Sequence, residues 1–172
     1  MSVISPDAEQ ALGSDFLERL RAADVFLPLR SVVEEGWVSE GDAMLLVAFR
    51  DSYFGDRSSF STVGEYETAV NGRGIPEDGI QSSGREKVRH LMRRGAAFAW
   101  AALHAANASN QSASLTSRIS VEPTLFDPEV VTGYVTFFTA EFASVLGVRS
   151  LGEKDGIQIL LESADCLEPL PD

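Results

Sequence analysis

Hydrophobic positions recur with a helical period through much of the first half of the chain. Ser5-Pro6-Asp7 has the composition of a helix start, and apolar residues then follow every three or four positions. This pattern predicts a helix from Ser5 to about Asp24. It also predicts a short helix over 29–36 that stops at Gly36, and another over 62–70 that stops at Asn71-Gly72.

Residues 40–53 fit two kinds of secondary structure. Ser39-Glu40-Gly41-Asp42 resembles a new helix start, but 43–49 is a continuous apolar run that suits a buried strand as well as a helix. We predict a helix over 40–53, because alanine, methionine and leucine favour helices. A strand over 43–49 is the alternative.

The longest predicted helix begins after Ser83 and covers 84–106. Its first half carries several basic side chains around a narrow apolar face, whereas its second half is apolar or small on nearly every side. A helix that is hydrophobic all round has to be covered all round. The second half is therefore expected to be the structural centre of the protein.

Beyond Asn107 the hydrophobic period changes from 3.6 to 2. Leu115 to Glu122 alternates as a strand with one buried face, and Val130 to Thr139 reads as an interior strand. Residues 148–151 and 157–161 read as a hairpin with Asp-Gly at its turn. Helices followed by strands predict an α+β fold, with an N-terminal helical layer and one long central helix packed on a C-terminal antiparallel sheet of about four strands.

The whole chain, 1–172, is expected to form a single α+β domain. Its 172 residues suit one domain, and 44% hydrophobic with 23% charged residues is typical of a globular protein. Within it, 1–107 is expected to be mainly helical with a loop over 55–83. Residues 113–163 are expected to form a β-meander, and 164–172 a frayed acidic tail.

The charge of the chain restricts its partners. Fourteen Lys and Arg against 26 Asp and Glu give a net charge of −12, which argues against nucleic acids and anionic membranes as partners. The single cysteine, Cys166, excludes an internal disulfide, and neither a signal sequence nor an apolar run of membrane length is found. We therefore expect a cytoplasmic protein.

Motifs for catalysis, cofactor binding or metal binding are missing from the sequence. There is no Gly-x-Ser-x-Gly nucleophile elbow, and Asn71-Gly72-Arg73-Gly74 does not fit a phosphate-binding loop. His90 and His104 lie too far apart on one predicted helix to share a metal, and His104 reads as a core histidine. We predict no metal and no cofactor; enzymatic activity remains open, with a non-enzymatic function favoured.

Acidic and aromatic residues gather in the polar middle of the chain. Aromatic side chains among acids are typical of protein-binding surfaces, and an acidic surface attracts a basic partner. The first hypothesis is an acidic protein-binding module that neutralises or chaperones a basic protein, as immunity proteins, antitoxins and secretion chaperones do. The alternative for these aromatics is a satellite hydrophobic cluster beneath a loop. The predicted contact residues are Asp51, Tyr53, Asp56, Glu65, Tyr66 and Glu67.

The basic half of the long helix supports a second hypothesis. Guanidinium groups suit phosphate and carboxylate ligands, so a pocket between sheet and helices could bind a small anionic molecule, as a binding protein or an enzyme. The alternative is that these side chains pair with the chain's own carboxylates. A third hypothesis is a structural subunit of a larger assembly. The residues of the predicted pocket are Arg89, His90, Arg93, Arg94 and Tyr134.

Overall fold

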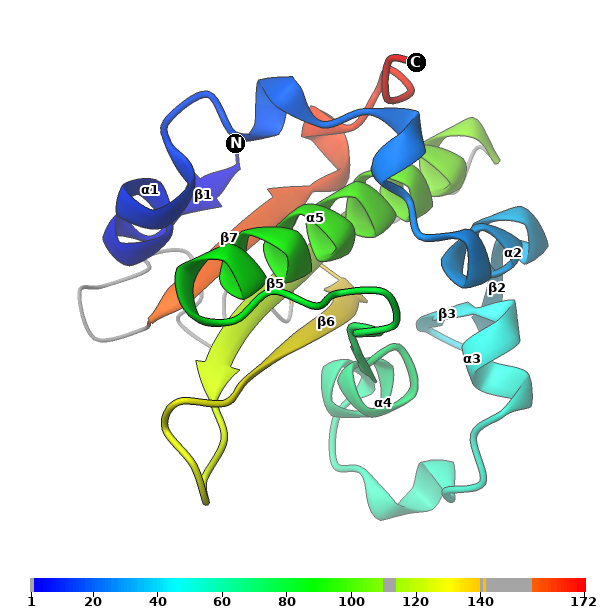
Figure 1. The fold of residues 1–172 in the computed structure, drawn as a ribbon. Coiled ribbons are helices and arrows are strands. Elements are labelled where there is room, and N and C mark those ends of the chain that lie inside the picture. The colour runs from blue at the N-terminus through cyan, green and yellow to red at the C-terminus, as the bar shows by residue number, and fades with distance from the viewer. Residues whose placement is uncertain (1, 110–113, 140, 142–155) are drawn as a thin grey trace.

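A five-stranded antiparallel sheet and one long helix, α5, organise the α+β fold (Figure 1). The computed structural model describes residues 2–109, 114–139, 141 and 156–172. The strand order in the sheet is β1-β7-β5-β6-β4, and β2 and β3 form a separate two-stranded sheet. The strands are β1 Val3–Ile4, β2 Trp37–Glu40, β3 Ala43–Leu46, β4 Arg73–Gly74, β5 Leu115–Pro123, β6 Val131–Thr139 and β7 Ile157–Glu162.

Helices surround the sheet unevenly. The α-helices are α1 Pro6–Leu12, α2 Leu27–Glu35, α3 Val47–Asp51, α4 Val63–Val70 and α5 Gly84–Ala108. Short 3-10 helices cover Leu17–Arg19, Ala22–Asp24, Arg57–Ser59 and Ser163–Asp165. Helix α5 runs along one face of the sheet, and both α1 and α2 pack against α5.

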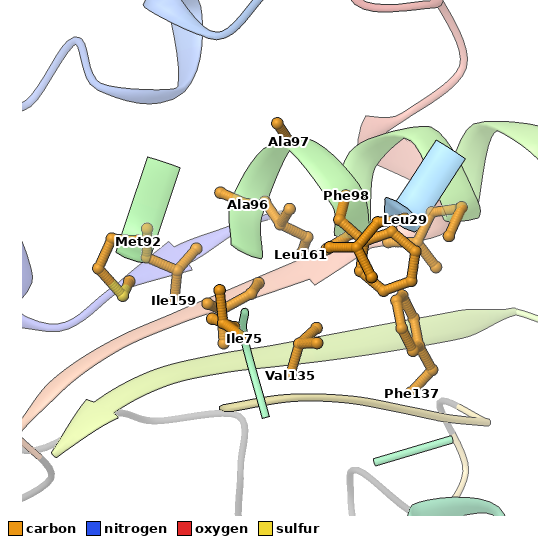
Figure 2. Close-up of a cluster of buried hydrophobic side chains, with 14 of the residues drawn as sticks. Leu29, Ile75, Met92, Ala96, Ala97, Phe98, Val135, Phe137, Ile159 and Leu161 are labelled. Atoms are coloured by element: carbon orange, nitrogen blue, oxygen red, sulfur yellow. The ribbon is translucent and has the colours of Figure 1, made fainter. Parts of the chain in front are cut away.

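The second half of α5 is the centre of the core, as its composition predicts. Ala96, Phe98 and Leu103 are fully buried, and Phe98 meets Phe137 of β6 edge to face at 5.6 Å. Figure 2 shows Phe98 and Phe137 facing each other between helix and sheet. This half is apolar nearly all round because it packs against the sheet on one side and also against α2.

The predicted starts of α1 and α4 and the predicted stop of α2 are confirmed. Ser5 caps α1 by accepting a hydrogen bond from the Ala8 amide, and Thr62 with Glu65 forms a capping box at α4. Helix α2 ends at Gly36, whose φ of 72° suits glycine. The predicted extent of the first helix is wrong, because α1 stops at Gly13 with φ 93° and two 3-10 turns replace the rest.

The predicted helix over 40–53 is wrong in its first part. Ala43–Leu46 is strand β3, paired antiparallel with β2 through a turn at Gly41, whose φ is 61°. All four residues of β3 are buried, so both faces of the strand are apolar. The sequence therefore lacks the alternation of apolar and polar residues that usually indicates a strand. The strand alternative therefore holds for 43–46, and helix α3 begins at Val47.

The sheet differs from the predicted meander. Strand β7 pairs with β5, not with the preceding strand β6, so β5 lies in the middle of the sheet. The strand was predicted to have one buried face, but Thr116 and Ser120 on its polar face are buried as well, with strands on both sides of β5. The predicted strand over 148–151 and its turn over 152–155 lie outside the described residues.

The C-terminal segment is packed, so the predicted frayed tail over 164–172 is wrong. Cys166 is fully buried, and this burial raises the pKa of its thiol to about 12. The Trp100 indole donates to the Glu168 carbonyl at 2.9 Å, and the Ala22 amide donates to the Pro171 carbonyl at 2.8 Å. The His104 ring, half-buried, lies 3.2 Å from the Cys166 carbonyl.

Ile75 fills a gap between helix and sheet that two glycines leave open. A Cβ at Gly95 would lie 2.5 Å from Ile75 Cδ1 and 2.8 Å from Ile119 Cγ2, and one at Gly133 would lie 2.8 Å from Ile75 Cδ1. A larger residue at Gly95 would therefore push α5 away from the sheet.

We expect Gly95→Val to lower the free energy of unfolding by about 1–3 kcal/mol, the usual cost of overpacking a core. Urea unfolding of purified variants measures this change. Valine has a higher helix propensity than glycine, so propensity alone would not lower the stability of Gly95→Val. Ala108→Val, at an exposed position at the end of the same helix, is the control for a valine in α5 that has no close neighbour to displace. Equal losses in the two variants would contradict the packing explanation.

Candidate functional site

The predicted acidic and aromatic contact surface does not form one exposed patch. Asp51, Asp56 and Glu65 are exposed and Tyr53 is half-buried. Tyr66 and Glu67 are 5% and 0% exposed, so their prediction as partner contacts is wrong.

Tyr66 belongs to a small hydrophobic cluster of its own. Its ring packs beside Tyr53 and Phe60, at centroid distances of 6.3 and 5.7 Å, over buried Leu45. Its hydroxyl donates to Glu40 at 2.9 Å, and burial raises its pKa. The aromatics at these positions therefore form the satellite cluster that was the alternative to a contact surface.

Glu67 and Asn71, one turn apart on and just after α4, join the two sheets. Glu67 Oε1 accepts from the Met44 amide and Oε2 from the Thr139 amide, both at 2.8 Å. Asn71 Oδ1 accepts from the Leu46 amide at 3.0 Å, and its Nδ2 donates to the Met44 and Phe137 carbonyls. These side chains take the place of a neighbouring strand along β3 and at the end of β6.

The exposed acids of the predicted surface have local partners. Arg50 donates to Asp51 at 2.6 Å. Asp56 accepts from the Ser58 amide, which lowers the pKa of the carboxyl, and Glu65 accepts from the Thr62 amide. These carboxylates thus order turns while they stay exposed to solvent.

A second exposed surface, not predicted from the sequence, lies at the tip of the β5–β6 hairpin. Leu125 and Phe126 are 99% and 98% exposed, and their acidic neighbours Glu122, Asp127 and Glu129 are exposed as well. Figure 1 shows this hairpin projecting beyond the body of the protein. The sequence indicates this surface by an apolar pair, Leu125-Phe126, directly before Asp127-Pro128 in the turn between two predicted strands.

Hydrogen bonds within the tip hold its backbone in one shape. The Thr124 amide donates to the Val130 carbonyl at 2.8 Å, and the Thr124 hydroxyl donates to the Asp127 carbonyl at 2.8 Å. Asp127 Oδ1 accepts from the Glu129 amide at 2.9 Å. The polar groups of the loop therefore satisfy one another, and Leu125 and Phe126 are left in solvent.

A groove of about 590 Å³ lies where the end of α1 meets the first half of α5. It brings together Arg89, His90 and Arg93, as the sequence predicts, and adds Arg19. The predicted place is wrong, because the groove lies between helical segments and not between sheet and helices. The predicted alternative, pairing with the chain's own carboxylates, holds for part of this set: His90 lies 3.8 Å from Glu86 and Arg93 3.4 Å from Asp24, whereas Arg89 donates to a backbone carbonyl.

Two predicted pocket residues lie elsewhere. Arg94 donates to the carbonyls of Pro76 and Asp78 and stacks on Phe26 at 3.9 Å, and its burial lowers its pKa. Tyr134 lies on β6 opposite Gly74 and does not line the groove. Their assignment to one ligand pocket with Arg89 is therefore wrong.

Comparisons with models of protein families, with curated proteins and with solved structures found no match to this chain. Among the described residues, no set of three or more His, Cys, Asp or Glu side chains is placed to hold a metal ion. None of the described helices combines the length and the apolar character needed to cross a membrane. Function is therefore inferred from the chain's own surfaces.

Proposed function

We propose that the protein is an acidic, non-enzymatic protein-binding module whose β5–β6 hairpin tip docks in an apolar recess of a basic partner protein. The observation that carries this proposal is the fully exposed pair Leu125 and Phe126, held outward by the loop's own hydrogen bonds. Such a module would neutralise or chaperone its partner, in the manner of an immunity protein, antitoxin or secretion chaperone.

Burial of the pair supplies the favourable free energy of docking. Moving a Leu or Phe side chain from water into an apolar recess is worth roughly 1.5–3 kcal/mol. Because the loop is already ordered by hydrogen bonds at Thr124 and Asp127, little conformational freedom is lost on binding. Aromatic anchors of this kind commonly dominate the affinity of an interface.

Charge favours a basic rim around the partner's recess. Glu122, Asp127 and Glu129, all exposed, flank the apolar pair in the sequence, and the chain as a whole carries a net charge of −12. An acidic surface speeds encounter with a basic protein, and salt weakens this attraction.

We further propose that the protein acts in the cytoplasm. Its single cysteine cannot form an internal disulfide, which is typical of proteins in a reducing compartment.

Affinity capture followed by titration tests the proposal. The tagged protein is used to retain partners from a lysate of its own host at low and high salt, and the retained protein is then purified for affinity measurement. We expect one stoichiometric basic protein whose retention falls with salt. The Leu125→Ser/Phe126→Ser variant should bind it roughly tenfold or more weakly. Leu27→Ser is the control: Leu27 is also exposed but lies on α2, away from the hairpin, so this variant should bind the partner as the parent protein does.

Phe54→Ser separates the two exposed surfaces, because Phe54 is 98% exposed in the loop that follows Asp51 and carries Asp56. Loss of the partner through Phe54→Ser, with full binding by the hairpin variant, would move the contact to that loop and overturn the hairpin assignment. Retention of no stoichiometric partner at either salt concentration would overturn the protein-binding function itself.

A further inference from the structure

The groove at the end of α1 is a cationic feature in an acidic protein. Arg19, Arg89, His90 and Arg93 line it, and its apolar lining comes from Leu12 and Phe16, which are 6% and 5% exposed. Among the described residues, its lining includes a single carboxylate, that of Glu86. A groove of about 590 Å³ is within the range of small-molecule sites.

Backbone carbonyls fix the arginines before any ligand arrives. The last carbonyls of α1 have no partner within their own helix, and arginine side chains supply it: Arg89 Nε donates to Ala11 at 2.8 Å and Arg19 Nη2 to Leu12 at 3.0 Å. Arg93 Nη2 donates to the Arg19 carbonyl at 3.1 Å. The carbonyls of Ala11 and Leu12 are consecutive, so the guanidinium groups of Arg89 and Arg19 lie against the same end of α1.

These contacts leave positive charge uncompensated at Arg89. Arg19 has Asp15 at 3.0 Å, and Arg93 has Asp24 at 3.4 Å. In the described part of the chain, Arg89 has no carboxylate at ion-pair distance, and its two terminal nitrogens donate to no acceptor. An arginine without a counter-ion in a chain of charge −12 is available to an anionic ligand.

We propose that the groove binds an organic phosphate, with the phosphate on the terminal nitrogens of Arg89 and the organic part toward Leu12 and Phe16. A guanidinium fork matches phosphate oxygens in geometry, and His90 and Arg93 add donors beside it. The site shares no residue with the hairpin tip. It therefore adds a ligand to the proposed module and does not depend on the partner protein.

Calorimetric titration with 1-naphthyl phosphate, 1-naphthol and inorganic phosphate tests this site at low salt. We expect one equivalent of naphthyl phosphate to bind, more tightly than either of the other two probes. Arg89→Gln should weaken binding roughly tenfold or more, since it removes charge-assisted hydrogen bonds. Arg50→Gln, on α3 at the opposite side of the protein from α1 (Figure 1), should change it less than about threefold, because its charge is remote from the groove.

Arg89→Gln also removes a hydrogen-bond donor from the end of α1, so it could weaken binding by disturbing the fold. Glu86→Gln avoids this problem, because Glu86 is exposed. It should tighten naphthyl phosphate binding about threefold by removing the repelling carboxylate. Equal weakening by Arg50→Gln and Arg89→Gln, no tightening by Glu86→Gln, or binding of naphthol or inorganic phosphate as tight as that of naphthyl phosphate would each overturn the proposal. Capture of the basic partner by these variants reports separately on the hairpin.

Discussion

Replacing Glu67 with alanine is expected to lower the free energy of unfolding by about 2–5 kcal/mol, because it leaves two buried amides without an acceptor. Those amides, of Met44 and Thr139, belong to different sheets, and each donates to a separate oxygen of the same carboxylate. Glu67 is 0% exposed, so water cannot replace it without opening the structure. The variant should loosen β3 and the end of β6 together.

Urea unfolding followed by circular dichroism measures this loss, with Glu65→Ala as the matched control. Glu65 lies on the same helix and also accepts backbone hydrogen bonds, but it is exposed. Its loss should cost about 1 kcal/mol, as for other helix caps. A cost for Glu67→Ala no greater than that of Glu65→Ala would show that the buried carboxylate does not join the sheets.

The pH dependence of Glu67 follows from its burial, which raises its pKa above the ordinary 4.5 in spite of the two amide donors. The folded protein then holds the proton more tightly than the unfolded chain does. The resulting stabilisation is fully present below pH 4.5 and is lost as the pH rises through the folded pKa. Relative to Glu67→Gln, whose side chain does not titrate, the parent protein should gain stability as the pH falls from neutral toward 4.5.

Local signals were sufficient to predict most helices and the strands β5, β6 and β7. A cap such as Ser5, a capping box such as Thr62 with Glu65, and a period-two segment such as 115–122 depend on neighbouring residues alone. Pairing across the chain depends on distant residues. The nature of 43–46 and the position of β7 beside β5 were therefore missed, since each is decided by the partner that the segment meets.

The candidate sites were predicted in part for the same reason. Composition identified acids and aromatics around 51–67, but only the fold turns Tyr66 and Glu67 inward against β3. Arg89 and Arg93 were predicted as anion ligands from the cluster of basic residues on the first half of the long helix, while Arg19 joins them from a segment distant in sequence. The hairpin tip was visible in the sequence, yet its meaning depends on exposure, which only the structure gives.

Asn71→Asp is expected to cost about 3–5 kcal/mol, the range found when a buried charge is left without a partner. The substitution keeps size and shape, and the Leu46 amide keeps its acceptor. In place of the amide nitrogen, however, a carboxylate oxygen faces the carbonyls of Met44 and Phe137, which are 2.8 and 3.2 Å away. The two carbonyl oxygens then face a negatively charged carboxylate, where the Asn71 amide nitrogen had donated to both and joined β3 to β6.

Asn107→Asp is the comparison that isolates the effect of burial. Asn107 also donates through Nδ2 to two carbonyls, those of Ser163 and Cys166 at 2.8 and 3.1 Å, but it is only half-buried. Water can reach its carboxylate, so we expect a cost of about 1–2 kcal/mol there. Stability of Asn71→Asp should recover at acidic pH, since the protonated carboxyl can donate to one carbonyl again. Equal costs at the two positions, or a loss at Asn71 that acid does not reduce, would mean that shape and not the placement of a donor joins the two sheets.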